Sequence, residues 1–475
     1  MVRRRQAAPA LTPPATPLVS PCPALYLSPM QSVDTLLHAR WIIPVEPDNV
    51  VLEHHSIAIS DGRILALLPS SEARLRYRAE TELELPDHAL IPGLINAHTH
   101  AAMNLMRGLA DDLPLMRWLN DHIWPTEARW VSEEFVHDGT QLAMAEMLRG
   151  GVTCFNDMYF YPDVTARCAA QVGMRATVGL IVIDFPSAWA QDADEYLRKG
   201  IQLHDRYHSH PLISTAFAPH APYTVGNAAL EKVAMYAEEL DVPIHMHVHE
   251  TADEVNQALA SSGQRPLARL DSLGLLSPRL LAVHMTQLND AEIERCAESG
   301  LHVVHCPESN LKLASGFCPV YKLHQAGINV ALGTDGAASN NDLDIIGEMR
   351  TAALLAKGVA GDASAIPAAS ALYMATLGGA RALGLDRETG SLNVGKQADI
   401  AAVYLGDVET QPLYHPLSKL VYSVSRDKVT DVWVAGRHLL KGRELTTLDM
   451  DAALARACHW REKIHNKDEH IKEQP

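Results

Sequence analysis

A histidine pair, His98 and His100, is the first feature of the chain whose residue types and spacing could support chemistry. The pair follows the apolar run 90–95, so we predict that it ends a β-strand. Side chains two residues apart on a strand share a face, and both imidazoles are therefore expected to point the same way. Such a pair is weak evidence for a metal site in a chain with 24 histidines. The metal hypothesis depends on whether further ligands fall at equivalent places.

Three further polar residues stand at the ends of later predicted strands. His247 belongs to the end of a strand predicted over 244–249, His284 ends the next one, and Asp335 follows a third. Polar residues at the carboxyl ends of barrel strands meet on the face where barrel enzymes build their sites. Imidazole and carboxylate groups suit zinc, with iron or manganese as alternatives, and such ligands leave room for a reactive water. The pattern favours a metal site over a set of surface or core histidines.

The region that carries these residues, 91–390, alternates predicted strands with predicted helices. The strands are predicted over 152–156, 175–183, 213–218, 244–249, 280–284, 303–306 and 330–334. The helices are predicted over 133–149, 227–240, 291–298 and 319–326. This α/β alternation predicts a (β/α)8 TIM-type barrel as the catalytic domain. A doubly wound open sheet is the alternative, but no GxGxxG motif follows any of these strands.

Both ends of the chain are instead rich in short predicted strands and turns. These strands are predicted over 35–43, 56–60, 63–68, 400–404, 429–434 and 438–440. Strand-rich pieces from opposite ends of a chain can pair into one small domain. We therefore expect a β-sandwich domain built from residues 31–90 and 391–446, followed by a helical tail over 447–475.

Composition narrows the classes of partner. The 475 residues include 40 Lys and Arg against 57 Asp and Glu, a formal net charge of −17. This balance favours a small-molecule substrate over nucleic acid. No apolar run approaches the roughly 20 residues of a membrane helix, and seven cysteines occur singly, so we expect a cytoplasmic protein without membrane association. Residues 1–30 are rich in proline and are predicted to be a disordered extension, with Met30 as an alternative start.

Several motifs together resemble a known superfamily. Residues 91–100, the HxxE pattern from His247 to Glu250, His284 and the turn 333–335 are similar to signatures of the amidohydrolase superfamily. Within it, the chain looks like the 5-methylthioadenosine/S-adenosylhomocysteine deaminases over nearly its whole length after Met30. The segments that carry this likeness are 98–104, 124–127, 218–223, 305–310 and 335–340.

The resemblance implies a ligand set and a substrate site. The implied ligands of one zinc ion per subunit are His98, His100, His247 and Asp335. The implied substrate contacts are Glu127, His220, Glu250 and Asp335. Binuclear relatives carry a bridging lysine after a middle barrel strand, but this chain has no lysine between residues 200 and 231, which favours the mononuclear branch. The family further implies a homodimer or a homotetramer.

Each implied residue has a chemical role that suits its side chain. Asp335 can bind the metal and accept a proton from the attacking water, and His284 can orient that water. Glu250 is placed to protonate the ring nitrogen beside the attacked carbon and then to pass a proton to the departing amine. The Glu127 carboxylate can accept hydrogen bonds from both ribose hydroxyls, and His220 can donate to a ring or ribose acceptor.

The resemblance therefore implies hydrolytic deamination of the adenine ring of 5′-methylthioadenosine or S-adenosylhomocysteine to the inosine analogue and ammonia. Apolar residues of the first barrel loop are compatible with a thioether tail; they are Met103, Leu105, Met106, Leu113, Met116, Trp118 and Trp124. Other mononuclear amidohydrolases are alternatives: a triazine chlorohydrolase or aminohydrolase, or a guanine or cytosine deaminase. A barrel that only binds a ligand is the remaining alternative, although every implied position holds a chemically competent residue.

Overall fold

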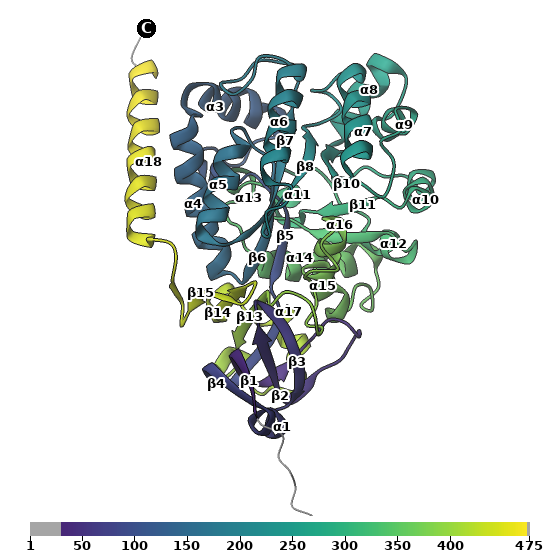
Figure 1. The fold of residues 1–475 in the computed structure, drawn as a ribbon. Coiled ribbons are helices and arrows are strands. Elements are labelled where there is room, and N and C mark those ends of the chain that lie inside the picture. Colours follow the sequence, from purple (N-terminus) through teal and green to yellow (C-terminus); the bar gives the residue numbers. More distant parts are fainter. Residues whose placement is uncertain (1–29, 473–475) are drawn as a thin grey trace, which may run out of the picture.

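The structure is a computed structural model that describes residues 30–472, and it divides into two units that are visible in Figure 1. A barrel wrapped in helices forms the upper unit, and a strand-rich unit lies beneath it. Of the predicted disordered extension, residues 1–30, all but Met30 lie outside the described range. Within that range, no helix is long and apolar enough to cross a membrane. The cytoplasmic location and the homo-oligomeric state stay predictions.

Eight parallel strands form the barrel, in which each strand pairs with the barrel strand that follows it in the chain, from β5 to β12. They are β5 (Leu94–Thr99), β6 (Val152–Asp157), β7 (Arg175–Val182), β8 (Ile213–Pro219), β9 (Ile244–Val248), β10 (Leu280–His284), β11 (His302–His305) and β12 (Asn329–Leu332). The first and last strands also meet, because the backbone N–H of Asp335 donates to the carbonyl of His98 at 3.0 Å. The predicted α/β barrel is therefore confirmed.

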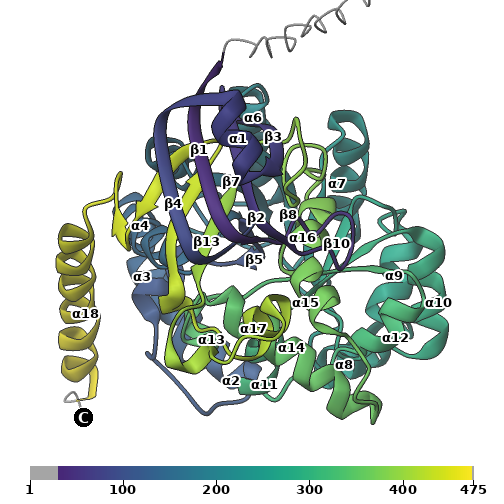
Figure 2. The same ribbon diagram turned by 90° about the horizontal axis from the view of Figure 1, so that it is seen from below.

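Helices cover the outside of the barrel (Figures 1 and 2). Side-chain caps explain where two of these helices begin. The Ser132 hydroxyl accepts from the backbone N–H of Phe135 at the start of α4 (Glu133–Arg149), and Asn289 with Glu292 forms a capping box at the start of α10 (Asp290–Ser299). The other helices around the barrel are α2 (Leu115–Trp118), α3 (Trp124–Trp130), α5 (Pro162–Val172), α6 (Ala193–Tyr207), α7 (Asn227–Leu240), α8 (Ala252–Ser262), α9 (Pro266–Ser272), α11 (Pro307–Lys312), α12 (Val320–Gln325), α13 (Ala337–Asn340), α14 (Ile345–Ala360), α15 (Ala368–Met374) and α16 (Leu377–Ala382).

Several short helical segments complete the chain. The first barrel loop contains a 3-10 helix η1 (Ala101–Met106) and a π-helix η2 (Leu119–Ile123) that joins α2 to α3. The segment after β13 contains η3 (Val408–Thr410), α17 (Pro416–Tyr422) and η4 (Arg426–Lys428). A π-helical turn is rare and often occurs at functional sites, and η2 lies directly before the helix that carries Glu127.

The small domain is built from both ends of the chain as one curled sheet in the order β16-β15-β14-β13-β4-β1-β2-β3. Its elements are β1 (Gln31–Ile42), β2 (Leu52–Ser60), β3 (Arg63–Pro69), α1 (Ser70–Arg76), β4 (Tyr77–Pro92), β13 (Ile400–Tyr404), β14 (Val429–Val434), β15 (Arg437–Lys441) and β16 (Glu444–Leu445). The sheet curls so far that the turn between β2 and β3 contacts the turn between β14 and β15. A Cβ on Gly62 would lie 2.6 Å from the Ala435 carbonyl oxygen. Ile57 and Trp433, from opposite ends of the chain, share one core between the resulting layers. These facing layers correspond to the predicted sandwich.

The two units are joined at the base of the barrel. Strand β4 ends at Pro92 and β5 begins at Leu94, so the longest strand of the small domain leads into the strand that carries His98. Arg175, the first residue of β7, donates from Nε to Asp399 Oδ2 at 2.8 Å and from Nη2 to Oδ1 at 3.1 Å. Both side chains are buried, so this ion pair fixes the small domain against the barrel.

The chain ends in α18 (Met450–Lys472), the yellow helix beside α3 and α4 in Figure 1. Trp460 is buried and donates from Nε1 to Asp138 Oδ2 at 3.0 Å, and Arg456 pairs with the same carboxylate at 3.0 Å. The Trp460 ring also meets Phe135 edge to face at 5.2 Å. The helix falls within the predicted tail 447–475 and packs against the helix that supports the first barrel loop.

Candidate metal centre and active site

Four side chains converge at the carboxyl end of the barrel: His98 on β5, His100 just after β5, His247 on β9 and Asp335 in the loop after β12. The Nε2 atoms of His98 and His100 each lie 3.2 Å from Asp335 Oδ1, and His247 Nε2 lies 3.2 Å from His98 Nε2. One ligand atom from each of the four lies within 4.8 Å of the others. The structure thus brings together the residues that the sequence resemblance implied as ligands.

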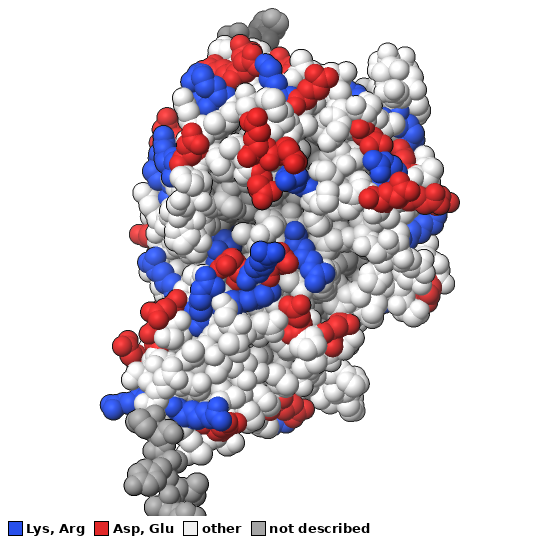
Figure 3. Space-filling view, turned by 45° about the vertical axis from the view of Figure 1, so that its right-hand side comes forward, with Lys and Arg blue, Asp and Glu red and all other residues white. Residues whose placement is uncertain are grey.

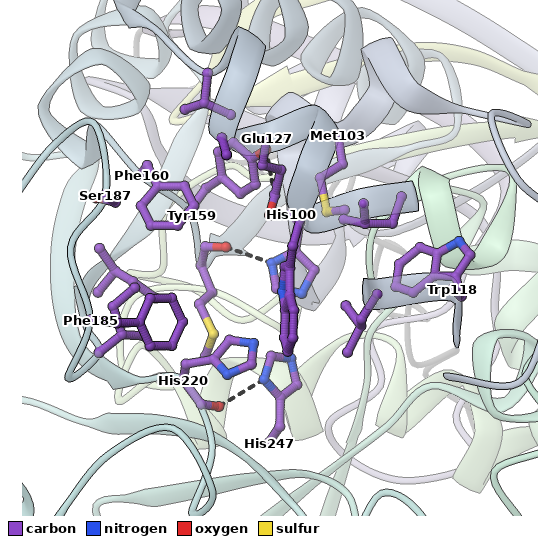
Figure 4. A pocket seen from close by; sticks show the side chains of 18 of the residues that line it. His100, Met103, Trp118, Glu127, Tyr159, Phe160, Phe185, Ser187, His220 and His247 are labelled. Atoms are coloured by element: carbon purple, nitrogen blue, oxygen red, sulfur yellow. Dashed lines mark hydrogen bonds between the residues drawn. The ribbon is translucent and has the colours of Figure 1, made fainter. Parts of the chain in front are cut away.

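The other nitrogens of these rings are held by hydrogen bonds that orient them. His100 Nδ1 lies 2.5 Å from the Met158 carbonyl oxygen, and His247 Nδ1 lies 2.8 Å from that of His220; both bonds are drawn in Figure 4. A carbonyl can only accept, so each Nδ1 carries a hydrogen, and each Nε2 would present its lone pair to a bound metal ion. His98 Nδ1 instead contacts His245 Nε2 at 2.8 Å.

Asp335 is kept ionised and in one orientation. Its Oδ2 accepts from the hydroxyls of Ser309 at 2.7 Å and Ser339 at 2.8 Å. Burial raises the pKa of this carboxyl, but hydrogen bonds from His100 and His98 outweigh burial and hold the pKa well below its usual value. Asp335 therefore offers a carboxylate oxygen to the centre at any ordinary pH.

Backbone strain marks three strand ends around the centre. His249, His284 and Asp335 follow or end β9, β10 and β12 with φ angles of 53°, 73° and 62°. Residues other than glycine seldom adopt this left-handed region, and each such residue costs of order 1–3 kcal/mol. Strain of this kind gathers at functional sites, where the surrounding packing maintains it.

Glu250 and His284 border the centre on one side. Glu250 is buried, and burial followed by the nearby Asp335 charge raises its pKa to about 8. His284 Nε2 lies 3.9 Å from Glu250 Oε2, while His284 Nδ1 lies 2.8 Å from Asn310 Oδ1. Burial lowers the pKa of His284. At neutral pH this pair is therefore a protonated carboxyl group beside a neutral imidazole.

Glu127 and His220 occupy two other parts of the same cavity, as Figure 4 shows. Glu127 Oε1 accepts from the Tyr159 hydroxyl at 2.7 Å, and burial raises the pKa of Glu127 to about 7. His220 Nδ1 lies 3.0 Å from Thr224 Oγ1, and burial, followed by the charges of His100 and His98, lowers the pKa of His220 to about 3.

These groups share one cavity of about 490 Å³. Its polar part is formed by His100, Glu127, Tyr159, Ser187, His220, Tyr223, His247, Glu250, His284 and Asp335. The remainder is largely apolar, and of the residues predicted to favour a thioether tail it includes Met103, Trp118 and Trp124. The predicted site residues therefore lie on one surface, except His98, which is buried beneath it.

Some residues of the site were not identified from the sequence as individual contributors. They are Tyr159, Ser309, Asn310 and Ser339. Ser309, Asn310 and Ser339 lie inside motifs that carry the family likeness, so the sequence indicated that these segments border the site. It did not indicate which side chains they bind. Tyr159 follows the end of β6 by two residues, and a polar residue just past a barrel strand is the signal that could have found it.

Comparison with known proteins settles the family. The model of the Amidohydrolase family matches residues 89–439. The chain belongs to the amidohydrolase family. This amidohydrolase is 52% identical over 436 residues to the 5-methylthioadenosine/S-adenosylhomocysteine deaminase of Teredinibacter turnerae, an alignment that covers 92% of this chain and 99% of that protein.

Solved structures agree with this placement. An adenosine deaminase from Xanthomonas campestris with bound zinc is 57% identical to the amidohydrolase and superposes with a TM-score of 0.91, covering 92% of this chain and 100% of the other. Atrazine chlorohydrolase from Arthrobacter aurescens, complexed with zinc, superposes with a TM-score of 0.84 at 23% identity, covering 90% and 99%. The second similarity shows a shared fold alone.

Proposed function

We propose that this amidohydrolase hydrolyses the amino group from the adenine ring of 5′-methylthioadenosine or S-adenosylhomocysteine, releasing ammonia and the inosine analogue. The observation that carries the proposal is a single cavity in which a metal-type ligand set, the buried acid Glu250 and the second carboxylate Glu127 face one another. The relative from T. turnerae, 52% identical, bears the name of a deaminase of these two nucleosides.

The donor set suits one zinc ion. Three imidazole nitrogens and one carboxylate oxygen lie together, and the Nδ1 hydrogens of His100 and His247 are already committed to carbonyl groups. These residues would hold a zinc ion, which would supply a water with a pKa lowered from about 15.7 to about 7 as the nucleophile at neutral pH. We propose His98, His100, His247 and Asp335 as its ligands.

Asp335 accepts a proton from the attacking water, and His284 orients that water. Asp335 is ionised, and the two serine hydroxyls fix its Oδ2, so its carboxylate can accept that proton. His284 Nδ1 is held by Asn310 Oδ1, which leaves the neutral Nε2 as a hydrogen-bond acceptor toward the cavity. The imidazole therefore orients the water by accepting a hydrogen bond from it.

Glu250 supplies the proton that the ring needs. Its pKa of about 8 keeps the carboxyl group protonated at neutral pH, so it can donate to the ring nitrogen beside the attacked carbon. Once ionised, it can take up a second proton and deliver it to the departing amine. Its backbone is held on both sides, because its N–H donates to Glu254 at 2.7 Å and its carbonyl accepts from Thr286 at 2.7 Å.

Glu127 and His220 hold the nucleoside. The Tyr159 hydroxyl occupies Glu127 Oε1, and the carboxylate still has acceptor capacity for the ribose diol. The Thr224 hydroxyl donates to the Ala221 carbonyl and so accepts from His220 Nδ1, which makes His220 Nε2 an acceptor. We therefore propose that His220 receives a hydrogen bond from a substrate hydroxyl, whereas the sequence led us to expect a donor.

The experiment is a substrate panel on zinc-loaded protein. Ammonia release and the spectral change from adenine to hypoxanthine are followed for 5′-methylthioadenosine, S-adenosylhomocysteine and adenosine, with guanine and atrazine as controls. Turnover of at least one adenine nucleoside, and none of the controls, is expected. Turnover of atrazine or guanine without any adenine nucleoside would replace this proposal with one of the alternative amidohydrolase activities.

A further inference from the structure

We infer that the cavity selects an adenine nucleoside whose 5′ substituent is uncharged and apolar, so that 5′-methylthioadenosine is preferred over S-adenosylhomocysteine. This inference rests on the proposed function, because it assigns the specificity of the same site. The two nucleosides share the adenine ring and the ribose and differ only in the tail on the 5′ sulfur. One tail is a methyl group, whereas the other ends in an ammonium and a carboxylate group.

The walls away from the catalytic groups are aromatic and aliphatic. Phe160 and Phe185 lie on one side of the central imidazoles in Figure 4, and Trp118 lies on the opposite side. Other apolar members of the wall are Leu115, Leu119, Ile123, Trp124, Val131, Ile181, Ile183 and Leu313. Burial of a methylthio group against such surfaces is favourable, and sulfur makes good contacts with aromatic rings.

The described lining of the cavity offers no lysine or arginine to a tail carboxylate. The carboxylic side chains among the lining residues are those of Glu127, Glu250 and Asp335. Among the described residues that line it, none is a lysine or an arginine. An ionised carboxylate that leaves water without a cationic partner is costly. Because no part of this lining offers such a partner, the penalty applies whichever wall the 5′ tail follows.

A hollow beside the cavity contains the guanidinium of Arg269, which is a candidate partner for a tail carboxylate. The hollow shares Phe185 and Tyr223 with the cavity and is also lined by Arg269 and Asp184. Arg269 already donates to the Asn227 side chain at 2.8 Å, to the Val225 carbonyl at 2.8 Å and to the carbonyl of Pro222. Arg269 therefore serves to hold the loop between β8 and α7, and Asp184 beside it repels a carboxylate.

On the face drawn in Figure 3, acidic and basic side chains lie beside one another on a largely uncharged surface. The formal net charge of −17 adds a general repulsion of anionic groups. Specificity is thus expected to come from an apolar wall that accepts a methylthio group and from the lack, in the described lining, of a lysine or arginine that could pair with an anionic tail.

The test compares kcat/KM of the zinc-loaded full chain for three substrates. We expect 5′-methylthioadenosine to exceed S-adenosylhomocysteine by about 100-fold, mainly through KM, since an unpaired charge is strongly rejected. The third substrate, 5′-butylthioadenosine, has a long but neutral tail and should stay within about tenfold of the methylthio compound. Equal kcat/KM for the methylthio and homocysteine compounds, or a butylthio compound as poor as the latter, overturns the inference. If no nucleoside is deaminated, the proposed function itself fails.

A variant of the neighbouring hollow gives a second arm. Arg269→Gln should leave the ratio of kcat/KM for the two natural nucleosides unchanged, with the melting temperature measured to register any loosening of the loop. Arg279→Gln is a matched control, because Arg279 forms exposed ion pairs with Glu238 and Asp241. A selective rise in KM for S-adenosylhomocysteine in Arg269→Gln alone would show that the hollow receives the charged tail, and would overturn the inference.

Discussion

Glu250 has the most distinctive chemical environment of the site, because burial makes a carboxyl group a proton donor at neutral pH. In Glu250→Gln the side chain keeps its shape but loses this proton. We expect kcat for 5′-methylthioadenosine to fall by about 10²–10⁴-fold, while KM changes little because the ribose contacts remain. Steady-state kinetics measure both quantities. Glu134→Gln, an exposed change on α4, serves as the control, and a large rise in KM without loss of kcat would contradict the assigned role.

The same residue predicts a pH dependence. A carboxyl group with a raised pKa is protonated below that pKa and ionised above it, so the active acid form of Glu250 is lost as pH rises through about 8. We expect the rate to decline by about tenfold per pH unit above this region. A pH profile of kcat on zinc-loaded protein checks the sign. Activity that still rises between pH 8 and 10 would contradict a protonated Glu250.

Tyr159 is a positioning residue for Glu127, because its hydroxyl occupies one carboxylate oxygen. Loss of that hydrogen bond in Tyr159→Phe should raise KM for adenosine by about tenfold and change kcat little. With 2′,3′-dideoxyadenosine, which has no diol, the variant and the original protein should have similar KM values. Tyr414→Phe, at a highly exposed tyrosine, is the matched control. An equal effect on both nucleosides would assign Tyr159 to general packing instead.

The sequence predicted the centre of the site better than its supports. His98, His100 and Asp335 could be placed together because the strand ends of a barrel meet on one face, and the family resemblance then implied them as ligands. The contacts of Ser309 with Asp335 and of Tyr159 with Glu127 join segments 26 and 32 residues apart. Such pairs depend on how loops after different strands fold over one another, and no local pattern encodes that arrangement.

At the level of elements, the strands buried on both faces were predicted closely. Residues 175–182 of β7 are all buried, and such continuous apolar runs bounded by turns are easy to recognise. β4 was not predicted, because its residues from 77 to 88 are largely polar and half exposed. Its strand conformation comes from pairing with β1 on one side and β13 on the other. These partners come from opposite ends of the chain, so the local sequence of β4 does not reveal them.

The ion pair of Arg175 with Asp399, which joins the small domain to the barrel, should affect the stability of the protein and not its catalytic rate. Arg175→Met leaves Asp399 buried without its cation, and breaking a buried pair costs about 3–5 kcal/mol. We expect a clear fall in melting temperature but an unchanged kcat for the folded protein, because Arg175 starts β7 at the end of the barrel opposite the site. Arg63→Met, which removes an exposed pair with Glu388, should change the melting temperature little. Equal shifts in the two variants would contradict this assignment.

At the scale of the whole molecule, the long-range pairs connect the site to distant parts of the chain. β4 carries the small domain into the first ligand strand, and α18 returns to α4, whose Gly139 lies against the segment just after His100. A Cβ on Gly139 would come within 2.4 Å of the Ala102 carbonyl oxygen. The first barrel loop is therefore supported by elements from both ends of the sequence, which is why its geometry follows only from the complete fold.

The chain should bind one zinc ion, although two groups of side chains among residues 30–472 have ligand-like composition. In the second group, His38 with Glu82 and Glu84, both carboxylates already pair with the Arg74 guanidinium, at 3.2 Å and 2.5 Å respectively. A fixed positive charge among these carboxylates opposes a divalent cation. We expect elemental analysis to find one zinc ion per chain in the original protein and in Glu84→Gln. In His100→Ala the zinc content should fall close to zero. Chelation should abolish deamination and lower the melting temperature, since a ligand that binds only the folded state stabilises it. Two zinc ions per chain, with one lost in Glu84→Gln, would instead place a second metal on the small domain.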